Sequence, residues 1–313
     1  MRRTDACRCL PLFALFVFEI KINQVKSFTF VYSLQCTGIA RESSEKRLRR
    51  LFWNSRKLFQ AFFAKNGMLV VPTHRNYKYL QKFLNSLFQP KTMDFEAVAA
   101  QLRKPEGDFG KKVGENMNAT NEKMNRTAID VMRLEAADTV LEIGMGNGAF
   151  CEDILQIHPT IRYTGCDFSE TMVAEARDRN QKWINVGQAD FLLTDAVDLP
   201  LEANSFTKAF TVNTLYFWPE PPQILVQLRR VLKPGGTLVI GIRPRTVMDN
   251  LPFVQYGFRT YTAHEVETLL QANGFTHTEI REFSEPDQEI DGQFYKMGFA
   301  VISGKKATES SAL

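Results

Sequence analysis

A glycine-rich turn between an apolar strand and a helix constrains the fold of this chain more than any other feature. Residues 139–143 are mostly apolar, Gly144, Gly146 and Gly148 follow at alternate positions, and residues 149–157 have the pattern of a helix. Glycine tolerates a positive φ, so the chain can turn tightly and its backbone can approach a ligand. The free N–H groups that open the following helix favour an anion. Such a unit is typical of doubly wound α/β folds, which bind ligands at the carboxyl ends of their strands.

The segment around this turn alternates between predicted strands and predicted helices. Strands are predicted at residues 139–143, 162–166, 184–188, 208–212, 237–242, 275–281 and 294–303. Helices are predicted at residues 94–103, 111–134, 149–157, 169–180, 222–232 and 262–273, the second one interrupted near residues 118–121. Thr262 and Glu265 have the spacing of a capping box at the start of the last helix. The alternation predicts an α/β, Rossmann-like, doubly wound, mostly parallel seven-stranded sheet with helices on both faces.

Charge divides the chain into two parts near Met93. Residues 1–92 carry 17 lysines and arginines against 4 acidic side chains, whereas residues 93–313 carry 22 against 31. We therefore expect a basic N-terminal extension, residues 1–92, in front of one core domain, residues 93–313. The extension has three interpretations: a targeting sequence, a membrane-surface segment with a basic helix at residues 41–65, or a gene-model extension before a true start at Met93.

Composition excludes several other classes of protein. The chain is 44% hydrophobic and 24% charged, as ordinary globular proteins are. The acidic core domain offers no basic face to a nucleic acid. The five cysteines are irregularly spaced, which favours reduced thiols in an intracellular, cytoplasmic protein, with organelle targeting by the extension as the alternative. The four histidines lack metal-ligand spacing, so no metal site is predicted.

The glycine turn by itself leaves two cofactors open. Gly144, Gly146 and Ala149 also fit the dinucleotide fingerprint, and Asp167 lies where that fingerprint has its ribose-binding acid. An NAD-linked oxidoreductase is therefore one hypothesis. No tyrosine is followed by a lysine four residues later, which disfavours a short-chain dehydrogenase.

Five motifs in order favour a different family. Residues 142–148, Glu-Ile-Gly-Met-Gly-Asn-Gly, resemble motif I of the class I S-adenosylmethionine-dependent methyltransferases. Residues 163–172 resemble that family's second strand and following helix, and residues 188–191 its adenine segment. Residues 198–206 are similar to its D-L-P-F stretch, and residues 228–236 to its turn before the fifth strand. The resemblance covers residues 93–305, is of the small-molecule, methyltransferase-11-like type, and implies S-adenosylmethionine as the cofactor.

The resemblance implies roles for the residues of the glycine turn. The backbone of Gly144, Gly146 and Gly148 is expected to face the methionine part of the cofactor. Glu142 is expected to support this loop. Asp167, at the end of the second strand, is expected to accept hydrogen bonds from the two ribose hydroxyls.

The adenine ring and the entrance to the site are assigned in the same way. Phe168 and Met172 are expected to form an apolar wall for adenine, and Asp190 and Phe191 to hydrogen-bond its edge. Asn118 and Arg103 lie where related enzymes carry a lid, so they either close over the cofactor carboxylate or belong to a surface loop. Two further acids, Asp195 and Asp198, are expected to be ordinary loop residues.

The acceptor side is expected after the fourth strand. Asn213 and Tyr216 match two positions of the N-P-P-Y motif of amino-group methyltransferases, while both prolines are missing. Asn213 and Tyr216 are therefore the candidate catalytic residues, with an aromatic pocket wall that includes Phe217 and Trp218 as the alternative. The expected partner is a small-molecule acceptor, methylated on nitrogen or oxygen. A methyltransferase fold that only binds is the remaining hypothesis.

Overall fold

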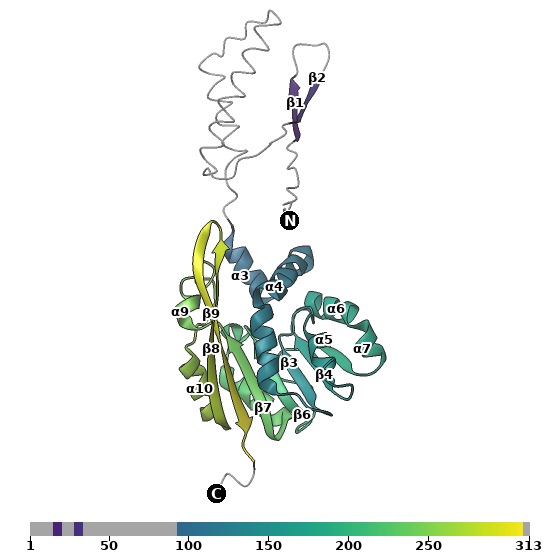
Figure 1. Cartoon of the computed structure of the whole chain (residues 1–313), viewed down its shortest axis with the longest axis vertical. Helices are drawn as coiled ribbons and strands as arrows, with labels where there is room; N and C mark the ends of the chain where they lie inside the picture. Colours follow the sequence, from purple (N-terminus) through teal and green to yellow (C-terminus); the bar gives the residue numbers. More distant parts are fainter. Residues whose placement is uncertain (1–14, 21–27, 34–92, 309–313) are drawn as a thin grey trace, which may run out of the picture. The chain divides into compact units, whose positions relative to one another are not determined.

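The computed structural model describes residues 15–20, 28–33 and 93–308. The chain divides into two compact units, residues 1–89 and residues 90–313. In the first unit, β1 (Leu15–Ile20) pairs antiparallel with β2 (Phe28–Ser33) (Figure 1). The basic helix predicted at residues 41–65 lies outside the described residues, as do Cys7, Cys9 and Cys36.

The second unit is built on a seven-stranded sheet with the order β5-β4-β3-β6-β7-β9-β8. Its strands are β3 (Thr139–Ile143), β4 (Arg162–Asp167), β5 (Ala189–Leu193), β6 (Phe206–Val212), β7 (Leu232–Ile242), β8 (Phe275–Ile290) and β9 (Gln293–Lys306). The first five in this order pair parallel, whereas β9 runs antiparallel to β7 and β8. The predicted mostly parallel, Rossmann-like sheet is confirmed. Its strand order reverses beside β3, which is where folds of this kind open a ligand crevice.

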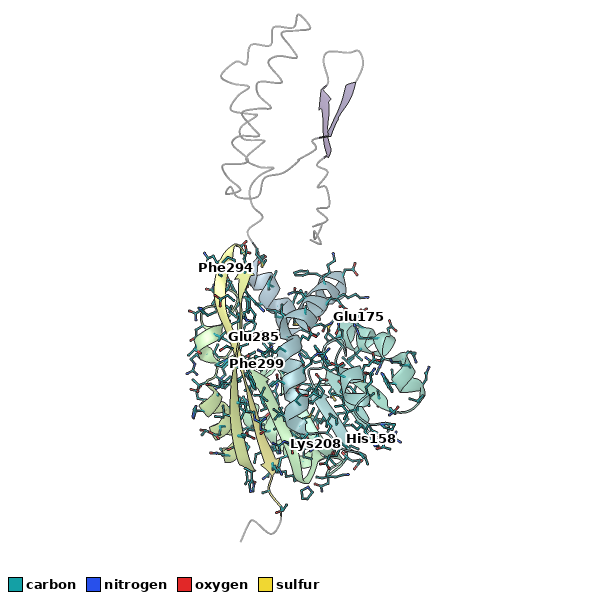
Figure 2. All side chains as sticks on the ribbon, viewed as in Figure 1. His158, Glu175, Lys208, Glu285, Phe294 and Phe299 are labelled. Carbon is teal, nitrogen blue, oxygen red and sulfur yellow. The ribbon has the colours of Figure 1, made fainter. Side chains whose placement is uncertain are left out.

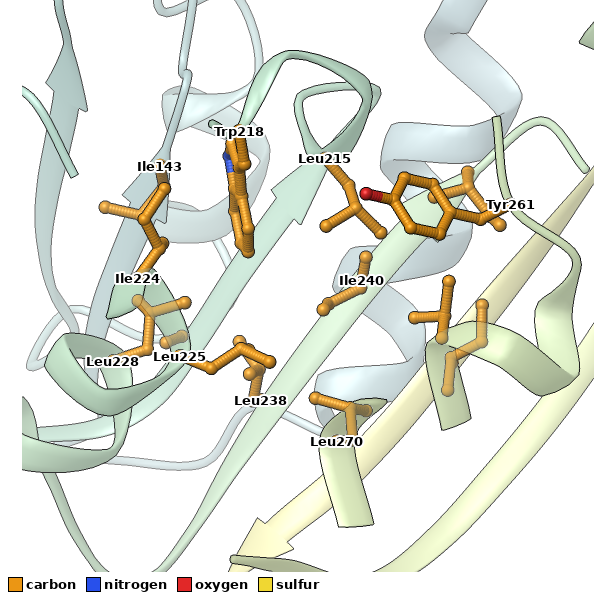
Figure 3. Packing of buried hydrophobic residues seen from close by; sticks show 14 of the residues in the cluster. Ile143, Leu215, Trp218, Ile224, Leu225, Leu228, Leu238, Ile240, Tyr261 and Leu270 are labelled. Carbon is orange, nitrogen blue, oxygen red and sulfur yellow. The ribbon is translucent and has the colours of Figure 1, made fainter. Parts of the chain in front are cut away.

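Helices cover both faces of the sheet, as predicted (Figure 1). They are α3 (Phe95–Arg103), α4 (Gly107–Met132), α5 (Cys151–Leu155), α6 (Glu170–Arg179), α7 (Gln181–Asn185), α8 (Pro221–Val231), α9 (Arg245–Met248) and α10 (Ala263–Ala272), with a 3-10 turn η1 at Leu215–Phe217. One core lies under α4, α5 and α6 and includes Met124 and Ile154. The other lies under α8 and α10 and includes Leu228 and Leu270 (Figure 3).

The predicted third strand at residues 184–188 is wrong. That segment contains the end of α7 and a turn at Gly187, whose φ is +68°, and β5 begins only at Ala189. Trp183 and Ile184 pack against the core from a helix rather than from a strand. Periodicity cannot distinguish the two in so short an apolar run, and the error displaces the end of this strand by five residues.

Helix α4 is continuous, so the predicted interruption at residues 118–121 is also wrong. Asparagine is a poor helix former, but tertiary contacts decide here. Met124 and Ala128 of the same helix are fully buried against the sheet. Arg243, which follows β7, donates to the carbonyl oxygen of Thr120 over 3.0 Å. The helix therefore crosses the sheet in one piece and presents one long face to the crevice.

The last two strands are longer than predicted and form an extended hairpin. β9 pairs with β7 only between residues 300 and 305, while its pairing with β8 continues to Gln293 opposite Ile290. Glu285 of β8 forms a buried ion pair with Arg243 (Figure 2 labels Glu285 on the hairpin). This pair ties the hairpin to the end of β7. None of the helices described is long and apolar enough to cross a membrane.

Candidate functional site

A cavity of about 220 Å³ lies at the carboxyl ends of β3, β4, β5 and β6. One face of α4 covers the cavity. Many of the residues predicted for the site line it, namely Arg103, Asn118, Glu142, Gly144, Gly146, Asp167, Phe168, Met172, Asn213, Phe217 and Trp218. Lys208 and His158, by contrast, lie toward the opposite end of the sheet (Figure 2). The cavity occupies the position predicted from the strand-turn-helix unit.

The glycine turn has the backbone that its sequence predicted. Gly144, Gly146 and Gly148 have φ values of +72°, +55° and +66°. A Cβ at Gly144 would stand 2.2 Å from Cγ2 of Thr214, so β3 and the loop after β6 approach each other only because this residue lacks a side chain. A Cβ at Gly148 would meet the side chains of α6 and β5, and Gly148 does not line the cavity. Its role in the described structure is packing.

Asp167 organises the turn from the end of β4. Its Oδ2 accepts from the backbone N–H of Gly146 over 3.0 Å, and its Oδ1 accepts from the N–H of Ser169 over 2.9 Å. The side chain is 8% exposed and lines the cavity. Burial raises the pKa of this carboxyl to about 6, against the lowering effect of its backbone hydrogen bonds. Asp167 therefore presents a poorly hydrated carboxylate to the cavity.

Glu142 lies under the glycine turn and is also buried. The hydroxyl of Tyr163 in β4 donates to its Oε2, so the carboxyl is turned toward β4. Burial, helped by the charge of Asp167, raises the pKa of Glu142 to about 7, against the lowering effect of the hydrogen bond from Tyr163. The side of the cavity formed by β3 and β4 thus holds two acids that gain charge near neutral pH.

The predicted adenine contacts are only partly brought together. Phe168 is 40% exposed at the cavity, and Met172 is fully buried beside it. Asp190 is exposed and accepts from the N–H of Phe191, whose ring is buried against Tyr163. Neither Asp190 nor Phe191 lines the cavity. Their predicted role came from the resemblance of residues 188–191 to the family's adenine segment, but these residues lie at the start of β5 and not at its end.

The true end of β5 brings other residues to the cavity. Thr194, Asp195 and Ala196 follow β5 directly and line the cavity. Asp195, expected to be an ordinary loop acid, therefore lies at the cavity. The apolar run at residues 191–193, followed by Thr194 and Asp195, was the available signal, and the incorrect strand boundary concealed it.

The segment after β6 separates the two candidate catalytic residues. Asn213 lines the cavity in a left-handed conformation with φ +58°. Tyr216 is 3% exposed and does not line the cavity. Its hydroxyl donates to Oδ1 of Asn213 over 3.0 Å and accepts from the backbone N–H of Arg243. Burial raises the pKa of this hydroxyl well above its usual value. The hydroxyl predicted to act in catalysis is therefore engaged by Asn213 and Arg243, away from the cavity.

A Tyr216→Phe variant is expected to lose stability and to keep cofactor affinity. Removing the hydroxyl leaves the buried N–H of Arg243 without its partner, a loss of about 1–3 kcal/mol that should lower Tm by several degrees. Tyr256→Phe, at an exposed ring, is the control and should melt like the wild type. An unchanged Tm together with a tenfold lower kcat would restore a chemical role to Tyr216.

Helix α4 and the segment before it are hydrogen-bonded to residues on the β3 and β4 side of the cavity. The hydroxyl of Ser169 donates to the carbonyl of Pro105, which lies between α3 and α4. Nδ2 of Asn147 donates to Glu115 of α4 over 3.1 Å. Oδ1 of Asn147 is buried at the cavity and has no hydrogen-bond partner among the described residues. Asn147, like Asn121 and Asn125 of α4, lines the cavity and was missed by sequence reasoning.

Comparisons with known proteins agree with this geometry. Residues 141–240 match the family model described as a methyltransferase domain. The chain is 29% identical over 130 residues to the uncharacterized methyltransferase YdaC of Bacillus subtilis (strain 168), covering 41% of this chain and 69% of the relative. It is 33% identical over 125 residues to the 27-O-demethylrifamycin SV methyltransferase of Amycolatopsis mediterranei (strain S699), covering 39% of this chain and 44% of that relative. The chain thus spans less than half of the second protein's length.

Solved structures share the fold. A protein in complex with the Haloferax volcanii Trm112 methyltransferase activator superposes with a TM-score of 0.55 at 21% identity, covering 69% of this chain and 98% of that chain. The YcgJ protein of Bacillus subtilis superposes with a TM-score of 0.51 at 16% identity, covering 60% of this chain and 99% of that chain. At these identities the likeness concerns the architecture of the second unit.

Proposed function

Because this chain carries a class I methyltransferase domain, we propose that it transfers the methyl group of S-adenosylmethionine to a nitrogen or oxygen atom of a small molecule. The observation that carries the proposal is the buried Asp167 carboxylate, held beside the glycine turn by the N–H of Gly146. A carboxylate in that position suits a ribose diol. A positive-φ turn beside it suits a ligand that must approach the backbone closely.

The described residues fit this cofactor. A Cβ at Gly146 would meet no atom within 4 Å, so the turn leaves open space above its backbone. Oδ1 of Asn147 is a buried acceptor that receives no hydrogen bond from the part of the chain described, as expected beside a ligand that carries N–H groups. Phe168 offers an exposed ring face for adenine. In place of Asp190, we assign Asp195 at the end of β5 as the acid beside the adenine edge.

Methyl transfer requires little more from the protein than correct placement of the cofactor and the acceptor. The cofactor supplies a methyl carbon activated by a sulfonium sulfur. Asp167, Asp195 and the glycine turn would hold it in one orientation, while Asn213 faces the cavity from β6. Alignment of reacting groups is worth roughly 7–11 kcal/mol of barrier, so no dedicated catalytic side chain is required.

Cofactor binding is expected to depend on pH through Asp167. Hydroxyl donors of a ligand favour the ionised carboxylate, and the free protein binds a proton there with a pKa of about 6. Affinity for S-adenosylhomocysteine should fall about tenfold for each pH unit below 6 and level off above it. Calorimetry in two buffers of different ionisation enthalpy should detect proton release near pH 6. Glu170→Gln, at an exposed neighbouring acid, should leave this profile unchanged, and a flat profile in the wild type would contradict the role of Asp167.

The ligand-free protein should show the opposite trend. Asp167 and Glu142 both have a pKa raised above that of the unfolded chain, so the folded state binds protons more tightly. Their contribution to stability is therefore lost as pH rises from about 4 to about 7. Cofactor binding should offset this loss, so that the ligand-induced rise in Tm grows over the same range.

A direct experiment tests the proposed function. Thermal unfolding with S-adenosylhomocysteine, NAD and NADP in separate samples should show a shift for the first ligand alone. At a hundredfold excess over Kd the ligand contributes about 2.7 kcal/mol. Incubation with methyl-labelled cofactor and a metabolite extract should then label a small molecule. A shift produced by NAD instead would favour the oxidoreductase hypothesis, and binding without any transfer would favour a binding module.

A further inference from the structure

The acceptor side of the cavity is lined by amides. Asn118, Asn121 and Asn125 follow one another on the cavity face of α4, and Asn213 lies at the end of β6. Asn125 is 7% exposed, and its Nδ2 donates to the carbonyl of Asn121 over 3.0 Å. Each asparagine lowers helix stability relative to alanine, and none of these side chains is needed as a cap. Oδ1 of Asn121 accepts from Arg243 over 3.4 Å, and Nδ2 of Asn118 donates to Glu115 over 3.5 Å. The remaining amide groups of the row provide donors and acceptors without charge.

Apolar and aromatic side chains complete this side. Phe217, Trp218 and Ile224 line the cavity after β6 and on α8. Trp218 is 6% exposed and belongs to the same buried core cluster as Ile143 (Figure 3). Phe217 packs on Phe258 with ring centroids 4.6 Å apart. Rigid aromatic walls of this kind suit a flat ligand.

The ionisable side chains that line the cavity lie on the side away from β6. Among the described residues, they are Arg103, Glu142, Cys166, Asp167 and Asp195, which come from α3, β3, β4 and the end of β5. Glu142 is turned toward Tyr163 and away from β6. The hydroxyl of Tyr216 is engaged by Asn213 and Arg243. Within the part of the chain that the structure describes, the lining on the β6 side thus offers neither a counter-ion nor a base.

From this distribution we propose that the acceptor is an uncharged, flat molecule methylated on a weakly acidic hydroxyl, a phenol or an enol. The inference rests on the proposed function. A charged acceptor would lose its hydration on binding without gaining a counter-ion. An alkylamine is protonated in neutral water, so it would bind as such a charged molecule. A phenol is neutral on entry, and the amides can hydrogen-bond its oxygen.

The reaction balances without a protein base. The hydroxyl releases its proton to solvent, and its oxygen forms a bond to the methyl carbon. The carbon–sulfur bond breaks with its electron pair remaining on sulfur, which leaves a neutral thioether. An aliphatic alcohol is too weak an acid for this route, since a base is required where the accepting atom must lose its proton during attack.

Binding of matched ring compounds tests the proposal. The full-length protein is saturated with S-adenosylhomocysteine, and 4-methylphenol, benzoate and benzylammonium are titrated by calorimetry. We expect 4-methylphenol to bind at least about tenfold more tightly than either charged ring compound. Equal or tighter binding of benzoate or benzylammonium would overturn the inference.

Transfer and one pair of variants supply a second readout. With labelled cofactor, kcat/KM should be higher for phenol than for benzyl alcohol, because only the phenol is acidic enough to release its proton to solvent. Asn121→Leu should weaken binding of 4-methylphenol about tenfold, whereas Asn116→Leu, at an exposed position of α4, should not. The S-adenosylhomocysteine shift in Tm should persist in both. Loss of that shift in the wild type would overturn the proposed function itself, whereas a retained shift with methylation of benzylamine would overturn only this inference.

Discussion

An Asp167→Ala variant is expected to bind S-adenosylhomocysteine at least ~100-fold more weakly than the wild type, because hydrogen bonds to a charged group contribute about 1.5–3 kcal/mol each. Two such bonds to a ribose diol would be lost. The backbone N–H groups of Gly146 and Ser169 would also lose their acceptor, so the turn would no longer be held in its binding conformation. The rise in Tm produced by the ligand should disappear at concentrations that saturate the wild type.

Two further variants serve as controls for this result. Asp198→Ala removes an exposed loop acid of the same unit and should leave the ligand shift intact. Asp167→Asn keeps the size of the side chain but removes its charge, so affinity should be weakened and the pH dependence near 6 should vanish. Wild-type affinity in Asp167→Ala would show that the cofactor does not use the end of β4.

A Gly144→Ala variant is expected to unfold at a clearly lower temperature. The new Cβ would stand 2.2 Å from Cγ2 of Thr214, at a residue whose φ of +72° already disfavours any side chain. The N–H of Gly144 also donates to the carbonyl of Cys166 over 2.7 Å, so the turn cannot move away without losing a strand-end hydrogen bond. A loss of about 3 kcal/mol or more should lower Tm by roughly 6–12 °C.

The neighbouring glycine provides the matched control. Gly146 has φ +55°, but a Cβ there would meet nothing within 4 Å, so Gly146→Ala should lose only about 1 kcal/mol. Its methyl group would extend into the open space of the turn and should weaken cofactor binding more than stability. Adding Thr214→Ser to Gly144→Ala removes the opposing methyl group and should recover part of the lost Tm. A Gly144→Ala protein that melts like the wild type would contradict the packing described here.

Sequence reasoning succeeded where local chemistry decides the structure. The strand at Thr139–Ile143 begins and ends as predicted, because an apolar run is followed directly by glycines that only a turn accommodates. The capping box of Thr262 and Glu265 is present for the same reason, since both of its hydrogen bonds are made within four residues. Asp167 could be placed because it ends the strand that pairs with the one before the glycine turn.

The rest of the site depends on contacts between distant segments. Ile184 belongs to a helix because of how it packs, and this single boundary decided whether Asp190 or Asp195 faced the cavity. The partners of the Tyr216 hydroxyl include the backbone of Arg243, 27 residues further along the chain. The asparagines of α4 line the cavity because the helix crosses the sheet unbroken, which their own helix propensity argues against. The periodicity of a sequence carries no information about such contacts between distant segments.

The contact between Gly144 and Thr214 also bears on how this protein can acquire new substrates. Residues assigned to the cofactor belong to β3, β4 and β5, whereas those assigned to the acceptor belong to α4, β6 and α8. The loop after β6 touches the turn after β3 through the methyl group of Thr214. An engineer who replaces residues 217–224 to change specificity would therefore leave the cofactor half untouched, provided that the side chain at position 214 is no larger. The two halves are also joined by the pairing of β3 with β6 and by the hydrogen bond from Asn147 to Glu115 of α4, so a library in α4 should keep Glu115.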